Sequence, residues 1–177
     1  MIKKLDINTK DNNKLLNNVV IGTSNYINFS NRKLPGNIVP VSISGDGGSG
    51  AGFRGLSFKK LAPSLDLYTY YKNNPDKLTN EELIEYYIKE YFNHRLKNSN
   101  GNEIIEALKS KFGGNLVLLC YEDIFEFCHR RLVADFISIT NNIEIPELIF
   151  YPNGNVLFQE AKDYKPQIKK LIKRNYK

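Results

Sequence analysis

Residues Asn115–Ile139, which read NLVLLCYEDIFEFCHRRLVADFISI, decide the fold of this chain. The run Leu116–Leu119 is uncharged and has the length of a strand, and a strand that is apolar on both faces suits the middle of a parallel sheet covered by helices. Asp123 and Glu126 then have the spacing of a helix start, because the first can accept from free amides and the second can bond back to the cap. The stretch predicts a central strand, a turn and a helix that begins at Ile124.

The predicted helix carries one buried stripe. Its apolar side chains recur at three- and four-residue steps, at Phe125, Cys128, Leu132, Phe136 and Ile139. Arg131 and Asp135 can pair across one turn. In an open α/β sheet ligands bind beyond the carboxyl ends of the strands, which is where this turn places Cys120, Tyr121 and Glu122.

Composition limits the classes of protein to consider. The chain has 177 residues, of which 41% are hydrophobic and 25% are charged, which suits one domain with a real core. No run approaches the roughly 20 apolar residues of a membrane span, and the first residues lack the apolar segment of a secretion signal. We therefore expect a soluble, cytoplasmic protein without membrane contact. The net charge of +6 favours anionic partners.

Three parts are expected along the chain: a loose leader over residues 1–18, a single α/β domain over 19–161, and a basic C-terminal helix over 162–177 packed on that domain. The domain is expected to have three layers, with a mainly parallel sheet, helices on both faces and a C-terminal antiparallel β-hairpin. The hairpin prediction rests on Asn153-Gly154, a strong turn signal between two apolar runs.

A crossover should connect the second strand to the central strand, as parallel pairing requires. Thr79 and Glu82 form a capping-box start for a helix that runs to about Leu96. Asn100-Gly101 breaks the chain before a second helix over Glu103–Lys111. His94 lies in an aromatic region, where a packed or surface histidine is more common than a ligand.

Two earlier strands end in polar segments. The first starts at Val19–Ile21 and should end in the turn Gly22–Tyr26, whose side chains suit a polar ligand. The second, Ile38–Ile43, runs into the loop Ser44–Gly55, which holds half of the 12 glycines. The loop contains G-x-G-x-x-G, but no helix should follow it, so dinucleotide binding is disfavoured. We expect its amides and Arg54 to approach an anion, the alternative being a surface loop without a ligand.

Three hypotheses explain the cluster of Cys120, Glu122, Cys128, His129 and Arg130. The first is that both cysteines are simply core residues. The second is a metal site with His94 as a fourth ligand, which requires a distorted helix because neighbouring helical residues diverge by about 100°. The third is a catalytic site in which a helix N-terminus lowers the pKa of Cys120 and Glu122 acts as acid or base. The cysteine-phosphatase loop is absent, since Glu126 stands where its arginine would be.

The same residues carry a family resemblance. The segments Leu118–Glu122 and Phe127–Arg130, followed by a helix with Ala134, resemble the signature of the YeaO-like family of small bacterial proteins, the domain-of-unknown-function family numbered 488. Ile21–Ser24 resembles that family's first-strand turn, and Gly55 with Leu61-Ala62-Pro63 resembles its segment after the second strand. The resemblance covers roughly residues 19–140. It implies an α/β fold with these turns at one rim, and no particular reaction.

We therefore expect three strand-end turns, Gly22–Tyr26, Ser44–Gly55 and Cys120–Arg130, to converge on one pocket. Its catalytic residues would be Cys120, Glu122 and His129. Its ligand contacts would be Thr23, Ser24, Asn25, Tyr26, Ser44, Arg54, Tyr121, Cys128 and Arg130.

The expected ligand is an anionic small molecule, either a nucleotide or another phosphorylated compound, and no cofactor or metal is expected. The alternative is a non-catalytic module that binds nucleic acid or a protein. It would use the basic tail, residues 162–177, and the loop Ser44–Gly55, called the glycine loop below. Both hypotheses leave the oligomeric state open.

Overall fold

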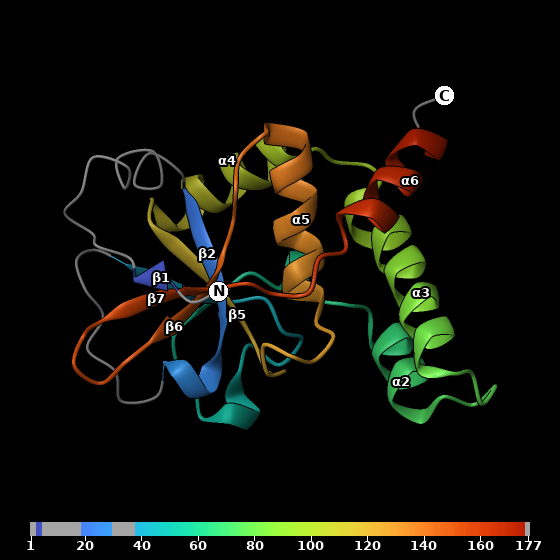
Figure 1. Ribbon diagram of the computed structural model, residues 1–177, viewed down its shortest axis with the longest axis horizontal. Coiled ribbons are helices and arrows are strands. Elements are labelled where there is room, and N and C mark those ends of the chain that lie inside the picture. Colours follow the sequence, from blue (N-terminus) through green and yellow to red (C-terminus); the bar gives the residue numbers. More distant parts are fainter. Residues whose placement is uncertain (1–2, 5–18, 30–37, 176–177) are drawn as a thin grey trace.

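The computed structural model describes residues 3–4, 19–29 and 38–175. Within them the chain forms one seven-stranded sheet in the order β1-β7-β6-β2-β5-β3-β4 (Figure 1). The strands are β1 (Lys3–Lys4), β2 (Val20–Asn25), β3 (Val39–Ser42), β4 (Leu56–Ser57), β5 (Leu116–Cys120), β6 (Glu147–Phe150) and β7 (Val156–Gln159).

The predicted fold class is confirmed. The strand β5 is an interior strand, the fifth of the seven, and is parallel to β2 on one side and to β3 on the other. The strand β6 is parallel to β2, whereas β6 and β7 form the predicted antiparallel hairpin. Pro40, which lacks an N–H, sits early in β3, before the residues that pair with β4. The protein is an α/β protein with a mostly parallel sheet.

Helices occupy the crossover and the C-terminal part of the chain. They are α2 (Leu65–Asn73), α3 (Asn80–Tyr91), α4 (Gly101–Phe112), α5 (His129–Asn141) and α6 (Lys165–Asn175). Short 3-10 helices span η1 (Tyr26–Asn28), η2 (Ser49–Ala51) and η3 (Lys59–Leu61), and a π-helical stretch, η4 (Phe92–Leu96), continues α3. The capping box of Thr79 and Glu82 is present at the start of α3, as predicted. None of the described helices combines the length and the apolar composition needed to cross a lipid bilayer.

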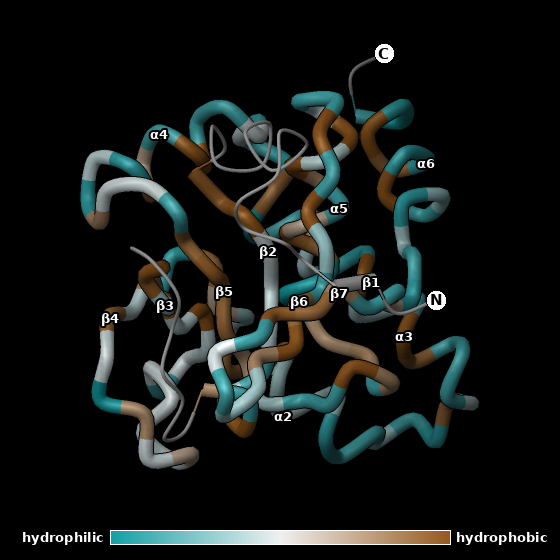
Figure 2. The backbone as a smooth tube through the Cα atoms, turned by 60° about the vertical axis from the view of Figure 1, so that its left-hand side comes forward, coloured by the Kyte–Doolittle hydropathy of each residue, from teal (hydrophilic) through white to brown (hydrophobic). Residues whose placement is uncertain are grey.

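The two faces of the sheet are covered differently. On β5, Leu116 and Leu118 join the larger core cluster, which includes the buried residues of α2 to α6. Val117 and Leu119 point the other way, into a smaller cluster built from β2, β6, β7, η1 and loop residues. Figure 2 shows the apolar β5 beside β2 in the middle of the molecule. In the described part of the chain the α-helical cover therefore lies on one face, whereas helices were expected on both faces.

Two local expectations are wrong. The helix after β5 begins at His129 rather than at Ile124, and Phe125, assigned to its buried stripe, is 81% exposed. The turn expected over Gly22–Tyr26 is mostly strand, because β2 continues to Asn25. Of the expected leader, residues 3–4 form β1 against β7, and the rest lies outside the described residues.

Candidate functional site

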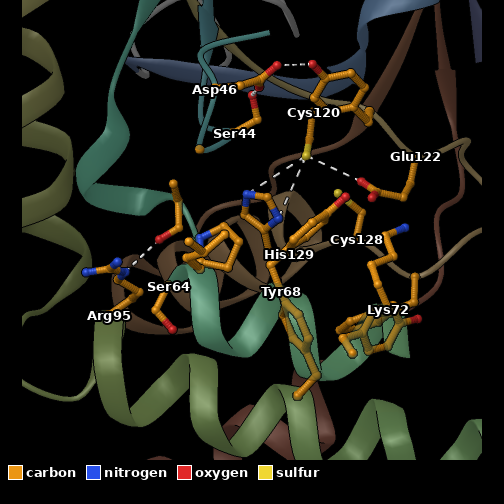
Figure 3. Close-up of a pocket in the computed structure, with 18 of the residues that line it drawn as sticks. Ser44, Asp46, Ser64, Tyr68, Lys72, Arg95, Cys120, Glu122, Cys128 and His129 are labelled. Atoms are coloured by element: carbon orange, nitrogen blue, oxygen red, sulfur yellow. Dashed lines mark hydrogen bonds between the residues drawn. The ribbon is translucent and has the colours of Figure 1, made fainter. Parts of the chain in front are cut away.

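A cavity of about 790 Å³ opens beside the carboxyl ends of β3 and β5 (Figure 3). The turn after β3 contributes Ser44, Gly45 and Asp46, and the turn after β5 contributes Cys120, Tyr121 and Glu122. Cys128 and His129, where α5 begins, complete the sheet side of the wall. The size falls within the range of small-molecule sites, and the position is the one that parallel α/β sheets reserve for ligands.

The two cysteines and His129 meet at this cavity. Figure 3 shows the Cys120 sulfur directed at His129 and Glu122. It lies 3.8 Å from Nδ1 and 3.9 Å from Nε2 of His129, and 3.3 Å from Oε2 of Glu122. One donor atom each from Cys120, Cys128 and His129 all lie within 4.8 Å of one another. The predicted catalytic residues Cys120, Glu122 and His129 are therefore brought together.

The backbone explains how neighbours in sequence can share one site. Cys128 is the N-cap of α5 and has an extended conformation, with φ −149° and ψ 139°. Because it stands outside the helix, the divergence of about 100° between neighbouring helical residues does not separate it from His129. At this position the positive end of the helix dipole also favours a negative charge.

His129 is oriented by β3. Its Nε2 lies 2.9 Å from the carbonyl oxygen of Ile43, to which it must donate because a carbonyl only accepts. In the neutral ring this assignment leaves Nδ1 free to take a proton. His129 is thereby held as a proton acceptor beside the thiols.

The surroundings shift the pKa values of the two thiols in opposite directions. A hydrogen bond with Cys128, together with burial, raises the pKa of Cys120 well above its usual value. Burial also raises the pKa of Cys128, but the Cys120 hydrogen bond and the positive charges of Arg130 and His129 lower it more, so that it lies well below the usual value. These opposite shifts favour the negative charge on Cys128 rather than on Cys120, where the sequence predicted it.

The negative charge on Cys128 also raises the pKa values of Glu122 and His129. Burial, followed by the charge of Cys128, raises the pKa of Glu122 to about 7. Burial lowers the pKa of His129, but the hydrogen bond and charge of Cys128 outweigh it and raise the pKa overall. These shifts favour negative charge on Cys128 and protonation of His129, beside a carboxyl group whose pKa of about 7 lets it give or take a proton.

The same three donor atoms bear on the metal hypothesis. Two sulfurs and an imidazole nitrogen within 4.8 Å could hold an ion such as zinc, with a position left for a ligand. His94, proposed as the fourth ligand, is not in this group and instead lies 3.5 Å from Glu90 with a largely exposed side chain. The metal hypothesis is therefore reduced to Cys120, Cys128 and His129.

The opposite wall of the cavity, which sequence reasoning missed, is aromatic. Tyr71, Tyr87 and Phe127 are in mutual contact, with ring centroids 5.0 to 5.6 Å apart. Tyr68 stands nearer the surface, with the ammonium group of Lys72 over its ring at 5.7 Å. The rings of α2 were missed because the segment Leu65–Tyr71 shows no decisive periodicity.

Three cations also line the cavity, namely Lys59, Lys72 and Arg95. Arg95 donates Nε to the carbonyl oxygen of Ala62 at 2.6 Å, and Tyr91 donates its hydroxyl to that of Leu61. These bonds hold the end of η3 and the residue after it against α3 and η4. The Arg95 bond uses one of the five N–H groups of the guanidinium. No local motif marks these residues, since they come from three separate segments.

The first of the three expected turns does not reach the cavity. Thr23 donates to Glu147, Ser24 donates to the carbonyl of Leu148, and Asn25 caps η1. Tyr26 bonds with Ser42 and Ser44 behind the rim. These four predicted ligand contacts instead bond within the sheet and its adjoining turn, and two turns converge on the cavity rather than three.

The glycine loop is closed on itself. The Asp46 carboxylate accepts from the amides of Gly48 and Gly50, and from hydroxyls of Ser44, Ser49 and Tyr121. These bonds outweigh the effect of burial and hold the pKa of Asp46 well below its usual range. Arg54 is exposed, donates to the carbonyls of Ser49 and Phe53, and does not line the cavity. The loop's own carboxylate thus occupies the place expected for an anion.

Arg130, which was expected to contact the ligand, is instead buried and bonded to other residues of the protein. It is 1% exposed, forms an ion pair with Glu147 at 3.0 Å, and donates to the carbonyls of Glu122 and Asp123. Its role is to fix the segment between β5 and α5. Phe127 in that segment packs edge-on against Tyr164 with centroids 5.3 Å apart, so the residues before α6 support the cavity from outside.

The predicted contacts Ser44, Tyr121 and Cys128 do line the cavity, together with Cys120, Glu122 and His129. Neither a curated protein nor a solved structure matches the chain. Residues 38–140, which supply every residue of the cavity wall, match the family described as "DUF488-N3a: Active DUF488-N3 subclade". This match spans more than half of the chain, and the protein therefore belongs to the DUF488 family.

Proposed function

We propose that the protein is an enzyme that acts on a nucleotide or another phosphorylated small molecule. One observation carries the proposal: Cys128, His129 and Glu122 meet in a cavity whose other walls supply aromatic rings and cations. A thiolate, a proton carrier and an acid or base around one space are the elements of covalent catalysis.

The walls support the choice of substrate. Tyr68 and Tyr71 offer ring faces or edges to a nucleobase, and stacking of a base on an aromatic side chain is worth about 1–3 kcal/mol. Lys59, Lys72 and Arg95 supply positive charge for phosphate groups, and Arg95 can bond a phosphate through two nitrogens. A volume of about 790 Å³ is sufficient for a nucleotide.

The roles in the reaction follow from the protonation states. The Cys128 thiolate is the nucleophile, which revises the assignment of that role to Cys120. His129 stabilises the thiolate and carries a proton at Nδ1, and Glu122 acts as general acid or base with a pKa of about 7. Cys120 donates its hydrogen bond to Glu122 and orients that carboxyl group.

A binding experiment on the full chain tests the proposal. Thermal unfolding is followed with a panel of nucleoside mono-, di- and triphosphates, with unphosphorylated nucleosides and with inorganic phosphate. We expect one or more nucleotides to raise the melting temperature by several degrees, since a ligand stabilises the state that binds it. Glu122→Gln should change that shift, whereas the matched control Glu106→Gln, exposed on α4, should not. A panel without any shift would contradict the proposal.

For the alternative, a binding module for nucleic acid or protein, only one of the two proposed binding surfaces, the basic helix α6, still offers free polar groups to a partner. The glycine loop has its amides bonded to Asp46, but α6 presents exposed lysines at 169, 170 and 173. The charge on α6 can therefore be tested separately from the cavity.

A further inference from the structure

We infer that Cys120 and Cys128 form a peroxide-sensitive thiol pair, in which Cys120 resolves oxidised Cys128 as an intramolecular disulfide. The inference concerns a modification site and does not depend on the proposed enzyme activity. It starts from a simple fact of composition, since Cys120 and Cys128 are the two cysteines of the chain. The fold brings both to one place.

Geometry favours the reaction. The two sulfur atoms lie within 4.8 Å of each other. A disulfide requires an S–S distance of about 2.05 Å, so the sulfurs must approach by a small movement. Residues 121–128 contain no helix or strand, and this segment can absorb the movement without unfolding β5 or α5.

Access is selective. Each cysteine has 2% of its surface exposed, yet both line the cavity of about 790 Å³. A molecule of the size of hydrogen peroxide can therefore reach the sulfurs, whereas the thiol of a second protein cannot. This arrangement favours a bond within the chain over a bond between chains.

The first step oxidises Cys128. Its thiolate attacks one oxygen of hydrogen peroxide, the O–O bond breaks, and the products are a sulfenic acid and hydroxide, which takes a proton from the His129 imidazolium to become water. Sulfur is oxidised and peroxide is reduced. The position of Cys128 at the N-cap of α5 supports this order of events, because the positive end of the helix dipole favours the thiolate, which is the reactive form.

The second step forms the disulfide. The sulfur of Cys120 attacks the sulfenic sulfur of Cys128, the S–O bond breaks, and water leaves with the proton of the Cys120 thiol. Glu122, whose Oε2 lies 3.3 Å from the Cys120 sulfur, is placed to remove that proton. A dithiol reductant reverses the step by taking up the two oxidising equivalents.

The experiment treats the full chain with hydrogen peroxide and follows intact mass. We expect the wild-type protein to lose two hydrogen atoms and to regain them with dithiothreitol. Chymotrypsin, which cuts after Phe125, should release one peptide pair joined by Cys120 and Cys128. Protein unfolded in guanidinium serves as a control and should react more slowly, because the neighbours that activate Cys128 are then removed.

Two variants separate the roles. In Cys120→Ser the resolving thiol is missing, so Cys128 should gain one and then two oxygen atoms and should no longer be restored by dithiothreitol. In Cys128→Ser oxidation of the remaining thiol should be at least tenfold slower. Cys120→Ala replaces Cys120→Ser if the first variant does not fold.

Three results would overturn the inference. The first is a wild-type protein that gains oxygen atoms as fast as Cys120→Ser. The second is a disulfide between chains on a non-reducing gel. The third is that both thiols stay reduced under conditions that oxidise the unfolded control.

Discussion

At the scale of single residues, the main asymmetry of the site lies between its two thiols. Cys120 ends β5 and donates to Glu122, whereas Cys128 caps α5 and receives the stabilising interactions of Cys120, His129 and Arg130. Burial acts on both in the same direction, so the neighbours decide which sulfur is charged. The two thiols should therefore react differently with the same reagent.

Alkylation measures that difference directly. We expect iodoacetamide at pH 6 to modify Cys128 at least tenfold faster than Cys120, because the pKa of Cys128 is lowered and that of Cys120 is raised. Peptide mapping by mass spectrometry gives both rates in one sample. Faster labelling of Cys120 would mean that the charges are assigned to the wrong sulfur.

Glu122 should make stability depend on pH. Its pKa is raised from 4.5 to about 7 in the folded state, so the folded protein holds this proton more tightly than the unfolded chain. The contribution is fully present below pH 4.5 and is lost as pH rises through about 7.

Glu122→Gln removes this dependence, since the amide stays neutral. We expect the variant to match the wild-type free energy of unfolding at pH 4.5 and to exceed it by about 3 kcal/mol at pH 8, the equivalent of the pKa shift from 4.5 to about 7. Urea denaturation at both pH values provides the measurement, with Glu106→Gln as control. A difference that is the same at the two pH values would argue against a raised pKa.

At the scale of elements, α5 is fixed to the sheet by buried charges. Arg130 and Arg131 both approach Glu147 of β6, and Arg131 also lies 3.6 Å from Asp135, the pair expected from the sequence. Thr23 of β2 donates to the same Glu147 carboxylate. The start of α5, and with it Cys128 and His129, is thus positioned by a carboxylate from another strand.

Removing the Glu147 carboxylate should destabilise the folded protein. We expect Glu147→Gln to lower the free energy of unfolding by about 3–5 kcal/mol, because it leaves buried guanidinium groups without their counter-charge. The matched control is Glu144→Gln, whose ion pair with Lys165 is at the surface with Glu144 83% exposed, and whose effect should stay below about 0.5 kcal/mol. Urea denaturation of both variants checks this, and equal effects would contradict the role given to Glu147.

The sequence predicted those elements that local patterns determine. The apolar run of β5, the capping box of α3 and the turn of the β6–β7 hairpin are all signals within a few residues, and all three are present. The helix start after β5 was misplaced for a physical reason. Glu126 does bond back to the amide of Asp123, but the carbonyls of Glu122 and Asp123 also accept from Arg130, and the helix begins only at His129.

The candidate site was predictable only in part for the same reason. Cys120, Glu122 and His129 are close in sequence and follow one strand, so their meeting could be expected. The pairing of Thr23 with Glu147 joins residues 124 positions apart, and the closure of the glycine loop depends on Tyr121, 75 positions from Asp46. Long-range contacts of this kind leave no local pattern.

At the scale of the whole molecule, α6 belongs to the core and also carries surface charge. Ile168 is buried in the larger core cluster, whereas Lys169, Lys170 and Lys173 are exposed. Deleting residues 162–177 would therefore damage the fold as well as remove the charge. Charge reversal separates the two effects.

We expect the triple variant Lys169→Glu, Lys170→Glu and Lys173→Glu to leave the nucleotide-induced rise in melting temperature unchanged. Lys72→Glu, a change of the same kind in the cavity wall, should abolish that rise. Binding to labelled DNA at several salt concentrations measures the alternative. If α6 binds nucleic acid, the triple variant should flatten the salt dependence by roughly one unit of slope per lysine.

The contact between Phe127 and Tyr164 has a consequence for biosynthesis. A ribosome makes the cysteines, the histidine and the carboxyl group of the cavity well before it makes the ring that braces them. Until Tyr164 has been synthesised, the cavity wall at Phe127 lacks this packing contact, and the cysteines are more accessible to oxidants than in the complete fold.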